Sequence, residues 1–256
     1  MSERMPVMFV GHGSPMNAVE DNEFSRAWRA AGAALPRPKA ILCVSAHWES
    51  YGTQVTAMDQ PRTIYDFYGF PPEMYAMIYP APGSPELAEH LREMIGKERV
   101  ALDQKWGYDH GAWSVLTRMF PEADVPVIQL SLDVNLAAQS HYNLGKKLGA
   151  LRSDGVLILG SGNIVHNLRM VMFEEQAYDW AVEFDGKVRD WIAAGDHDPI
   201  IHYENGGQAA ALSINSAEHY KPLLYVLGAS EKGEPVNFFT EKVFGGSISM
   251  RSLRIG

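Results

Sequence analysis

The chain has 256 residues, of which 46% are hydrophobic and 21% are charged, and its formal net charge is −9 at pH 7. This length suffices for one large α/β domain, and the composition is that of an ordinary globular protein. The negative charge and the lack of a basic cluster argue against nucleic-acid binding. No apolar run approaches the roughly 20 residues that a helix needs to cross a bilayer, so no membrane interaction is expected.

The first residues of the sequence and its cysteine content bear on whether the protein is secreted or cytoplasmic. The first residues, MSERMPVMFVG, lack the pattern of a secretory signal peptide. Cys43 is the single cysteine and lies in the apolar run AILCVSAH, so no internal disulfide is possible. We expect Cys43 to be a buried, inert thiol rather than a nucleophile. These features predict a cytoplasmic protein.

Short runs rich in valine, isoleucine and leucine alternate with amphipathic segments along the chain. Such runs are typical of strands that are buried on both faces of a parallel sheet. The predicted strands are Val7–Val10, Ala40–Ser45, Gln54–Ala57, Val125–Leu130, Val156–Leu159, Leu223–Leu227 and Ser247–Leu253. The alternation predicts an α/β fold in which residues 1–256 form a single domain, with a mostly parallel central sheet and helices on both faces.

Helical periodicity is clear in two of the intervening segments. Apolar residues recur three or four positions apart in Pro85–Lys97 and in Ala177–Ala194, and polar residues occupy the opposite face. A third predicted helix extends to about Leu151. We expect Asp133 or Asn135 to cap its start.

The stretch from Met58 to Gly83 breaks the alternation. It contains five prolines and six aromatic residues, and the prolines exclude a long helix or a central strand. The aromatic side chains either form the wall of a pocket for a flat ring or simply pack over the edge of the sheet. The sequence leaves both interpretations open.

Four histidines, His12, His47, His166 and His219, stand where apolar runs meet turns. The first three follow predicted strands, and α/β sheets bind ligands at the carboxyl ends of their strands. His219 precedes the predicted strand Leu223–Leu227 and must therefore reach the same edge from a loop. Neutral imidazole is the commonest protein ligand for borderline transition metals. The pattern predicts a metal-centred active site at the carboxyl edge of the sheet.

Other polar residues allow two interpretations each. His110, beside Asp109, either donates a hydrogen bond to a bound anion or merely starts a helix. Glu49, close to His47, either orients an imidazole or is a surface carboxylate. The remaining histidines are interpreted as surface or packing residues: His90, His141, His197 and His202.

Seven motifs together resemble one known family. They are, in chain order, VGHGSPMNA, VSAHWES, TIYDFYGFP, YDHGAWSVL, QLSLD, LGSGNIVHNL and SAEHYKPLLYVLGA. They resemble the class III extradiol ring-cleaving dioxygenase superfamily, and within it the DOPA 4,5-dioxygenase-like branch. The resemblance covers nearly the whole chain. It implies one α/β domain with a single non-haem metal, normally Fe(II), that binds a catechol and O2 together.

The resemblance also implies roles for individual residues. His12, His47 and His219 match the metal ligands of the family. His166 matches a histidine beside the metal that acts as acid and base and sometimes reaches the metal, and His110 matches one that binds substrate or intermediate. Many extradiol enzymes use two histidines and one carboxylate, whereas the branch resembled here has His219 at the third position. Three neutral imidazoles also suit Zn(II), so the identity of the metal stays open.

The implied reaction opens a catecholic ring, DOPA-like or related, beside its diol with O2 and gives a muconic semialdehyde. The alternative is a zinc-dependent hydrolase that uses the same histidine cluster to activate water. The expected partners are the catecholic substrate and O2, without nucleic acid or membrane. The sequence predicts no oligomeric state.

Overall fold

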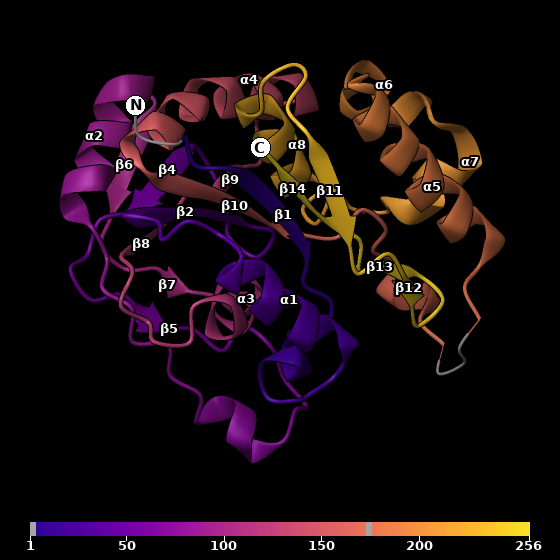
Figure 1. Ribbon diagram of the computed structural model, residues 1–256, viewed down its shortest axis with the longest axis horizontal. Helices are drawn as coiled ribbons and strands as arrows, with labels where there is room; N and C mark the ends of the chain where they lie inside the picture. Colours follow the sequence, from indigo (N-terminus) through magenta and orange to yellow (C-terminus); the bar gives the residue numbers. More distant parts are fainter. Residues whose placement is uncertain (1–3, 173–175) are drawn as a thin grey trace.

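A six-stranded sheet occupies the centre of the computed structural model, which describes residues 4–172 and 176–256 (Figure 1). Its strands are β1 (Val7–Gly11), β2 (Ala40–Ser45), β8 (Val127–Gln129), β10 (Val156–Gly162), β11 (Val236–Phe239) and β14 (Ser252–Ile255). Their order is β11-β14-β1-β10-β2-β8. The pairs β1–β10, β10–β2 and β2–β8 are parallel, whereas β14 pairs antiparallel with β1 and β11. The prediction of a mostly parallel sheet is confirmed.

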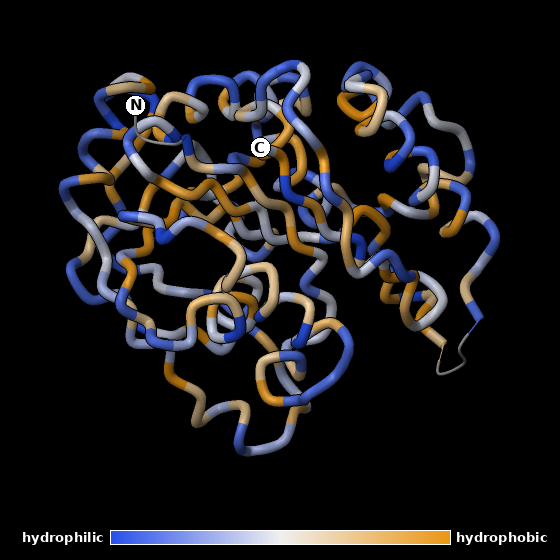
Figure 2. The backbone as a smooth tube through the Cα atoms, viewed as in Figure 1, coloured by the Kyte–Doolittle hydropathy of each residue, from blue (hydrophilic) through white to orange (hydrophobic). Residues whose placement is uncertain are grey.

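Helices cover both faces of this sheet, as predicted. Successive residues of a strand point to opposite faces, so Val7 and Phe9 of β1 contribute to one apolar core and Met8 and Val10 to the other. The first core includes α2 (Pro85–Ile95), α4 (Ala138–Leu148), α5 (Asp179–Ala194) and α8 (Lys221–Ala229), and the second includes α1 (Glu23–Ala33) and α3 (His110–Met119). The central strands are correspondingly hydrophobic in Figure 2. The short helices α6 (Asp198–Ile201) and α7 (Gly207–Ser213) lie beside α5 (Figure 1).

The prediction of a strand over Leu223–Leu227 is wrong, because these residues belong to helix α8. A buried run of apolar residues has the same pattern in a strand and in a helix that is covered all round. Every residue from Pro222 to Ala229 is buried, since α8 lies between β10 and α4. The helices approach so closely that a Cβ atom at Gly228 would lie 2.2 Å from the carbonyl oxygen of Tyr142. Pro222, in the first turn, was the available sign of a helix start.

Three other predicted elements differ in detail. Gln54–Ala57 contributes to β4 (Thr53–Thr56), but β4 pairs with β6 (Val100–Asp103) outside the central sheet. Ser247–Leu253 is split between β13 (Ile248–Ser249), which pairs with β12 (Val243–Phe244), and β14. The predicted strand at Val125–Leu130 shortens to β8.

The predicted cap of α4 is also wrong. The helix begins at Ala138 after Ala137, whose side chain makes no capping hydrogen bond. Asp133 instead accepts hydrogen bonds at Oδ1 from the backbone N–H groups of Asn135 and Gly52. Asp133 thus stabilises the turn before the helix and its contact with the neighbouring β3 (Glu49–Ser50), which pairs with β9 (Leu132–Asp133).

The aromatic segment, residues 58–83, folds irregularly as expected. Its regular elements are β5 (Arg62–Thr63) and the 3-10 turn η2 (Pro72–Tyr75), and β5 pairs with β7 (Gly107–Tyr108). Tyr65 packs against the core below the sheet and donates a hydrogen bond to the Met77 carbonyl at 2.7 Å. Tyr68, in contrast, is 92% exposed. The segment therefore combines packing residues with side chains that are free of the core.

Two further expectations concern Cys43 and membrane spans. Cys43 is a free thiol and fully buried in β2, as predicted. None of the helices in the described parts of the chain has the length and apolar character needed to cross a bilayer.

Candidate metal centre

Five histidine side chains meet at the carboxyl edge of the parallel strands. His12 directly follows β1, His47 and His166 follow β2 and β10 after short turns, and His110 is the first residue of α3. His219 reaches the cluster from the loop before α8, as predicted, although α8 is a helix rather than a strand. The ring centroids of His12, His47 and His219 are 5.0 to 5.2 Å from one another. The sequence therefore identified every imidazole of the cluster.

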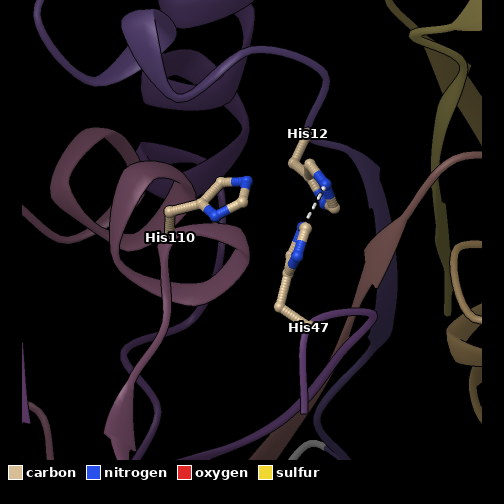
Figure 3. A group of neighbouring side chains, drawn as sticks. All are labelled: His12, His47 and His110. Carbon is tan, nitrogen blue, oxygen red and sulfur yellow. Dashed lines mark hydrogen bonds between the residues drawn. The ribbon is translucent and has the colours of Figure 1, made fainter. Parts of the chain in front are cut away.

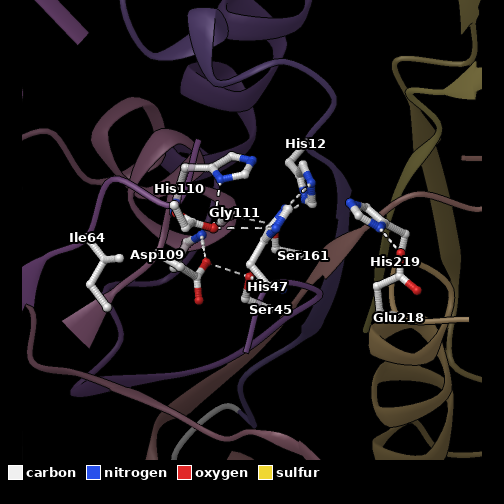
Figure 4. A network of polar contacts seen from close by, with 12 residues as sticks. His12, Ser45, His47, Ile64, Asp109, His110, Gly111, Ser161, Glu218 and His219 are labelled. Atoms are coloured by element: carbon white, nitrogen blue, oxygen red, sulfur yellow. Dashed lines mark hydrogen bonds and ion pairs between the residues drawn. The ribbon is translucent and has the colours of Figure 1, made fainter. Parts of the chain in front are cut away.

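A short contact in the cluster joins the Nε2 atoms of His12 and His47, which are 3.1 Å apart (Figure 3). Metal–nitrogen bonds of about 2.0–2.1 Å place two nitrogen ligands of one ion about 2.9–3.4 Å apart. The ring of His219 points toward the same space from the opposite side (Figure 4). The spacing thus fits two ligands of a single ion.

The hydrogen on His12 is assigned by its neighbours. Ser161 donates its hydroxyl hydrogen to the carbonyl of Gly111 at 2.6 Å, so its oxygen can only accept from His12 Nδ1, which is 3.0 Å away. His12 therefore carries its hydrogen on Nδ1. The lone pair of Nε2 faces the cluster.

Neighbouring carboxylates favour a hydrogen on Nδ1 in His219 and His47 as well. His219 Nδ1 lies 3.1 Å from a carboxylate oxygen of Glu218, and His47 Nδ1 lies 3.4 Å from a carboxylate oxygen of Asp66. A carboxylate accepts hydrogen bonds and cannot donate them. His219 therefore directs an unprotonated Nε2 inward, and the carboxylate near His47 Nδ1 favours the same tautomer in that ring. Fixing Nδ1–H on an oxygen acceptor is how proteins orient metal-binding histidines.

The donor set has the chemistry of a metal site. With hydrogens on the Nδ1 atoms, two Nε2 lone pairs face each other across 3.1 Å between His12 and His47, an arrangement that a shared cation stabilises. His12, His47 and His110 offer nitrogen atoms within 4.8 Å of one another, and His166, Glu218 and His219 form an adjoining group of the same kind. These residues fit a resident divalent ion bound by nitrogen.

Burial keeps these imidazoles neutral. It lowers the pKa of His12 and His219 well below the usual value, and the positive charges of neighbouring histidines lower it further. Burial followed by the charge of His110 lowers the pKa of His47 to about 3. For His166, burial lowers the pKa to about 4, partly opposed by the charge of Glu218. Neutral imidazole is the form that binds a metal.

His166 lies against His219. The two rings are stacked with their centroids 3.4 Å apart and their planes 9° from parallel. The backbone N–H of His166 donates to the carbonyl of Ser213 at 2.9 Å, which anchors the turn that carries the ring. His166 thus stands beside the three converging imidazoles.

His110 both starts a helix and faces the cluster. Asp109 caps α3 by accepting a hydrogen bond from the Ala112 N–H, and it also accepts from Ser45 at 2.6 Å and from Gln129 at 2.7 Å. The resulting network fixes the start of α3 below the site (Figure 4). The His110 ring lies 3.8 Å from that of His47, between centroids. The two interpretations of His110 are therefore compatible.

The sequence did not reveal the residues whose oxygen atoms contact the imidazole Nδ1 atoms. It assigned no role to Asp66 or Ser161, whose contribution depends on side chains distant in sequence. It offered Glu49 instead, but Glu49 forms an exposed ion pair with Lys221 at 3.4 Å and is a surface carboxylate. The signal available for Asp66 was its place within TIYDFYGFP, a motif otherwise rich in aromatic residues.

The remaining histidines lie outside the cluster, as predicted. His90 and His202 are exposed, and His197 is half-buried and contacts the Tyr142 hydroxyl. His141 is fully buried and its Nδ1 lies 2.9 Å from the Tyr225 hydroxyl. They are surface or packing residues.

Comparison with known proteins agrees with this geometry. Residues 5–248 match the family described as the catalytic LigB subunit of aromatic ring-opening dioxygenase. The chain is 48% identical to a protein of Escherichia coli K12 named 4,5-DOPA dioxygenase extradiol, with 100% of this chain and 96% of the relative covered. It is 37% identical to a protein of the same name from Beta vulgaris, with 96% and 94% covered.

A solved structure shares the fold. The crystal structure of an uncharacterized protein from Escherichia coli K12 superposes with a TM-score of 0.87 at 44% identity, covering 99% of this chain and 100% of the other. The chain belongs to the LigB family of class III extradiol dioxygenases, and it is a metal-dependent aromatic ring-opening dioxygenase.

Proposed function

We propose that this enzyme cleaves a catecholic ring of the DOPA type with O2, beside the diol, and releases a muconic semialdehyde. The observation that supports it best is the convergence of His12, His47 and His219, whose ring centroids are 5.0 to 5.2 Å apart and whose Nδ1 atoms each lie near an oxygen. Relatives that share the whole chain are named 4,5-DOPA dioxygenase extradiol. The substrate class is taken from those names.

In this proposal His12, His47 and His219 hold one Fe(II) ion. When bound, Fe(II) lowers the pKa of a coordinated catechol hydroxyl and passes electrons from the ring to O2, which redox-inert Zn(II) cannot do. Zinc, which binds such sites more tightly than Fe(II), can still be the metal found in a purified sample. His166 offers a nitrogen within 4.8 Å of one on His219 and is the candidate for a further ligand.

His166 and His110 are the proposed catalytic residues. His166 is neutral at neutral pH because its pKa is lowered to about 4, so its ring accepts a proton from the second catechol hydroxyl and later returns one. His110 carries its hydrogen on Nδ1 toward Asp66 at 2.9 Å. Its Nε2 is then free to accept a hydrogen bond from a substrate hydroxyl, or to donate one to an anionic oxygen when the ring is protonated.

Phe67 supplies a wall for the substrate ring. It follows Asp66 in the aromatic segment, and its ring meets that of His110 edge to face at 5.6 Å between centroids. It also contacts Trp113 at 6.1 Å. An aromatic side chain beside a hydrogen-bonding imidazole suits a flat phenolic ring. Phe67, which also packs against the second core, is the proposed pocket residue of this segment.

The catalytic unit in this proposal is the whole chain, residues 1–256, because the proposed ligands follow β1 and β2 near its start and precede α8, which packs on the same sheet, near its end. We also propose a cytoplasmic location, since a chain with one cysteine forms no internal disulfide.

Oxygen consumption tests the proposal. The protein is stripped of metal, reloaded anaerobically with Fe(II) or Zn(II), and offered a panel of catechols that includes L-DOPA. We expect O2 uptake with Fe(II) alone, together with a yellow ring-opened product. Binding of metal without O2 uptake on any catechol would contradict it, and would direct the search to zinc-dependent hydrolysis, which consumes no O2.

A further inference from the structure

We propose that Asp66 is a positioning residue that holds two imidazoles of the metal centre, His47 and His110, in a single tautomer and orientation. The inference rests on the proposed function, since it assigns His47 to the metal and His110 to the substrate. It adds a residue that links these two halves of the site.

One carboxylate serves both rings. Asp66 Oδ2 lies 2.9 Å from His110 Nδ1 and 3.4 Å from His47 Nδ1. Its other oxygen accepts a hydrogen bond from the backbone N–H of His110 at 2.8 Å. The backbone of Asp66 faces solvent, but its side chain is only 18% exposed. The side chain is therefore turned inward and fully engaged.

This arrangement decides which nitrogen of each ring faces the site. The rings of His47 and His110 are 3.8 Å apart and tilted by 45°, and both direct Nδ1 toward the same acceptor. Because a carboxylate only accepts, His110 Nδ1 carries hydrogen, and the same carboxylate at 3.4 Å favours hydrogen on His47 Nδ1. The Nε2 atoms are left free on the other side, for the metal and for the substrate. In an asparagine at this position, the amide oxygen would accept from the His110 backbone N–H, so the NH2 group would face His110 Nδ1 and favour the opposite tautomer.

A short parallel pairing of two strands positions Asp66 beside His47 and His110. Arg62 and Thr63 of β5 pair with Gly107 and Tyr108 of β7, and the Ile64 N–H donates to the Tyr108 carbonyl at 2.7 Å. Asp66 then lies opposite the start of α3. The next residue along the chain is Phe67, so one short segment carries both the acceptor and the proposed wall of the substrate pocket.

The charge of Asp66 also suits a site with three neutral ligands. Two histidines and one carboxylate would place a negative charge directly on a divalent ion. Here the carboxylates stand behind the imidazoles, Asp66 at His47 and Glu218 at His219. A hydrogen-bonded carboxylate raises the basicity of a ligand imidazole. Asp66 therefore supports His47 through its nearby charge and fixes His110 through a hydrogen bond.

The test compares Asp66→Asn with wild type, with Glu49→Gln as the matched control. Glu49 is an exposed carboxylate two residues from His47, and its partner is Lys221. Zinc affinity is measured by chelator competition, imidazole tautomers by ¹⁵N NMR of the zinc-loaded full chain, and kcat and KM with Fe(II).

We expect Asp66→Asn to lower zinc affinity about 10- to 100-fold, to move hydrogen from Nδ1 to Nε2 on His110, and to lower kcat more than it raises KM. Glu49→Gln should match wild type.

A second variant separates positioning from packing. Asp66→Glu keeps the carboxylate on a longer side chain, and should retain the Nδ1–H tautomer of His110 and more zinc affinity than Asp66→Asn. The inference is overturned if Asp66→Asn matches wild type in tautomer and zinc affinity, or if both variants lose affinity equally without a change of tautomer. If wild type binds zinc but shows no O2 uptake on any catechol, the proposed function fails, while the tautomer comparison still decides the role of Asp66.

Discussion

The imidazoles of His166 and His219 are stacked face to face, with their ring centroids 3.4 Å apart. His219 is held by Glu218 at Nδ1, whereas the ring of His166 takes its position from this stacking and from its anchored backbone. A metal ion bound by His219 would therefore have His166 at its side. This places a neutral base next to the ligand set without requiring it to be a ligand.

Replacement of His166 by glutamine should separate chemistry from metal binding. We expect metal content to stay at the wild-type level, because His12, His47 and His219 keep their partners, and kcat to fall by about 10²–10⁴-fold with the loss of the acid–base group. Metal analysis and O2 uptake on the same preparation measure both. Unchanged turnover would refute the acid–base role, and loss of the metal would make His166 a ligand.

Phe67 and Tyr68 are adjacent in sequence but differ in environment. Phe67 contacts His110, while Tyr68 is 92% exposed. Phe67→Ala should raise KM for the catechol about tenfold with little change in zinc affinity, since aromatic contacts contribute about 0.5–1.5 kcal/mol. Tyr68→Ala is the control and should leave KM unchanged. Equal KM values for the two variants would remove Phe67 from the substrate pocket.

Gly111 allows His47 and α3 to approach closely. A Cβ atom there would lie 2.5 Å from Ser45 Oγ and 2.8 Å from His47 Cδ2. Gly111→Ala should therefore displace His47, weaken zinc binding about tenfold or more, and cost about 1–3 kcal/mol of folding free energy. Chelator competition and thermal unfolding measure the two effects.

Gly186 provides the matched control in the interior of α5, where an added Cβ meets nothing within 4 Å. Gly186→Ala should keep zinc affinity and raise stability by up to about 1 kcal/mol, because alanine favours a helix. Wild-type zinc affinity in Gly111→Ala would contradict the proposed constraint on His47.

The buried histidines predict how the stability of the metal-free chain depends on pH. Burial lowers the pKa of His12 and His219 strongly and that of His166 to about 4. As the pH falls below about 6.5, the unfolded chain takes up protons at these groups and the folded chain does not. The unfolded state then binds more protons, so stability decreases as the pH falls from about 6.5 to about 4.

Each such group contributes a slope of up to about 1.4 kcal/mol per pH unit in this window. Urea unfolding at several pH values measures it, and His166→Gln should reduce the slope. Stability that stays constant between about pH 6.5 and 5 would show that these imidazoles are not buried in their neutral form.

Local sequence was sufficient for the elements that carry the site. The apolar runs that became β1, β2 and β10 end beside His12, His47 and His166, and the carboxyl ends of parallel strands share an edge. Leu223–Leu227 was assigned wrongly because α8 is buried all round and has no polar face to reveal helical periodicity. The error left the placement of His219 intact, because a loop precedes the element in either case.

The residues whose oxygen atoms contact the histidine Nδ1 atoms could not be predicted from local sequence. Asp66 reaches His110 through the pairing of two residues in β5 with two in β7, which is too short to leave a strand pattern. Ser161 acts through the carbonyl of Gly111, a group that carries no sequence signal. Glu49 lay nearer to His47 along the chain and was the more obvious candidate, yet its side chain is on the surface.

Anomalous diffraction at the zinc edge, from crystals of the zinc-loaded chain, tests most directly that His12, His47 and His219 hold one ion. We expect a single strong peak within about 2.0–2.1 Å of the Nε2 atom of each of the three residues, with Asp66 near His47 Nδ1 and Glu218 near His219 Nδ1. A peak elsewhere, or an ion bound through Nδ1 or directly by either carboxylate, would contradict it.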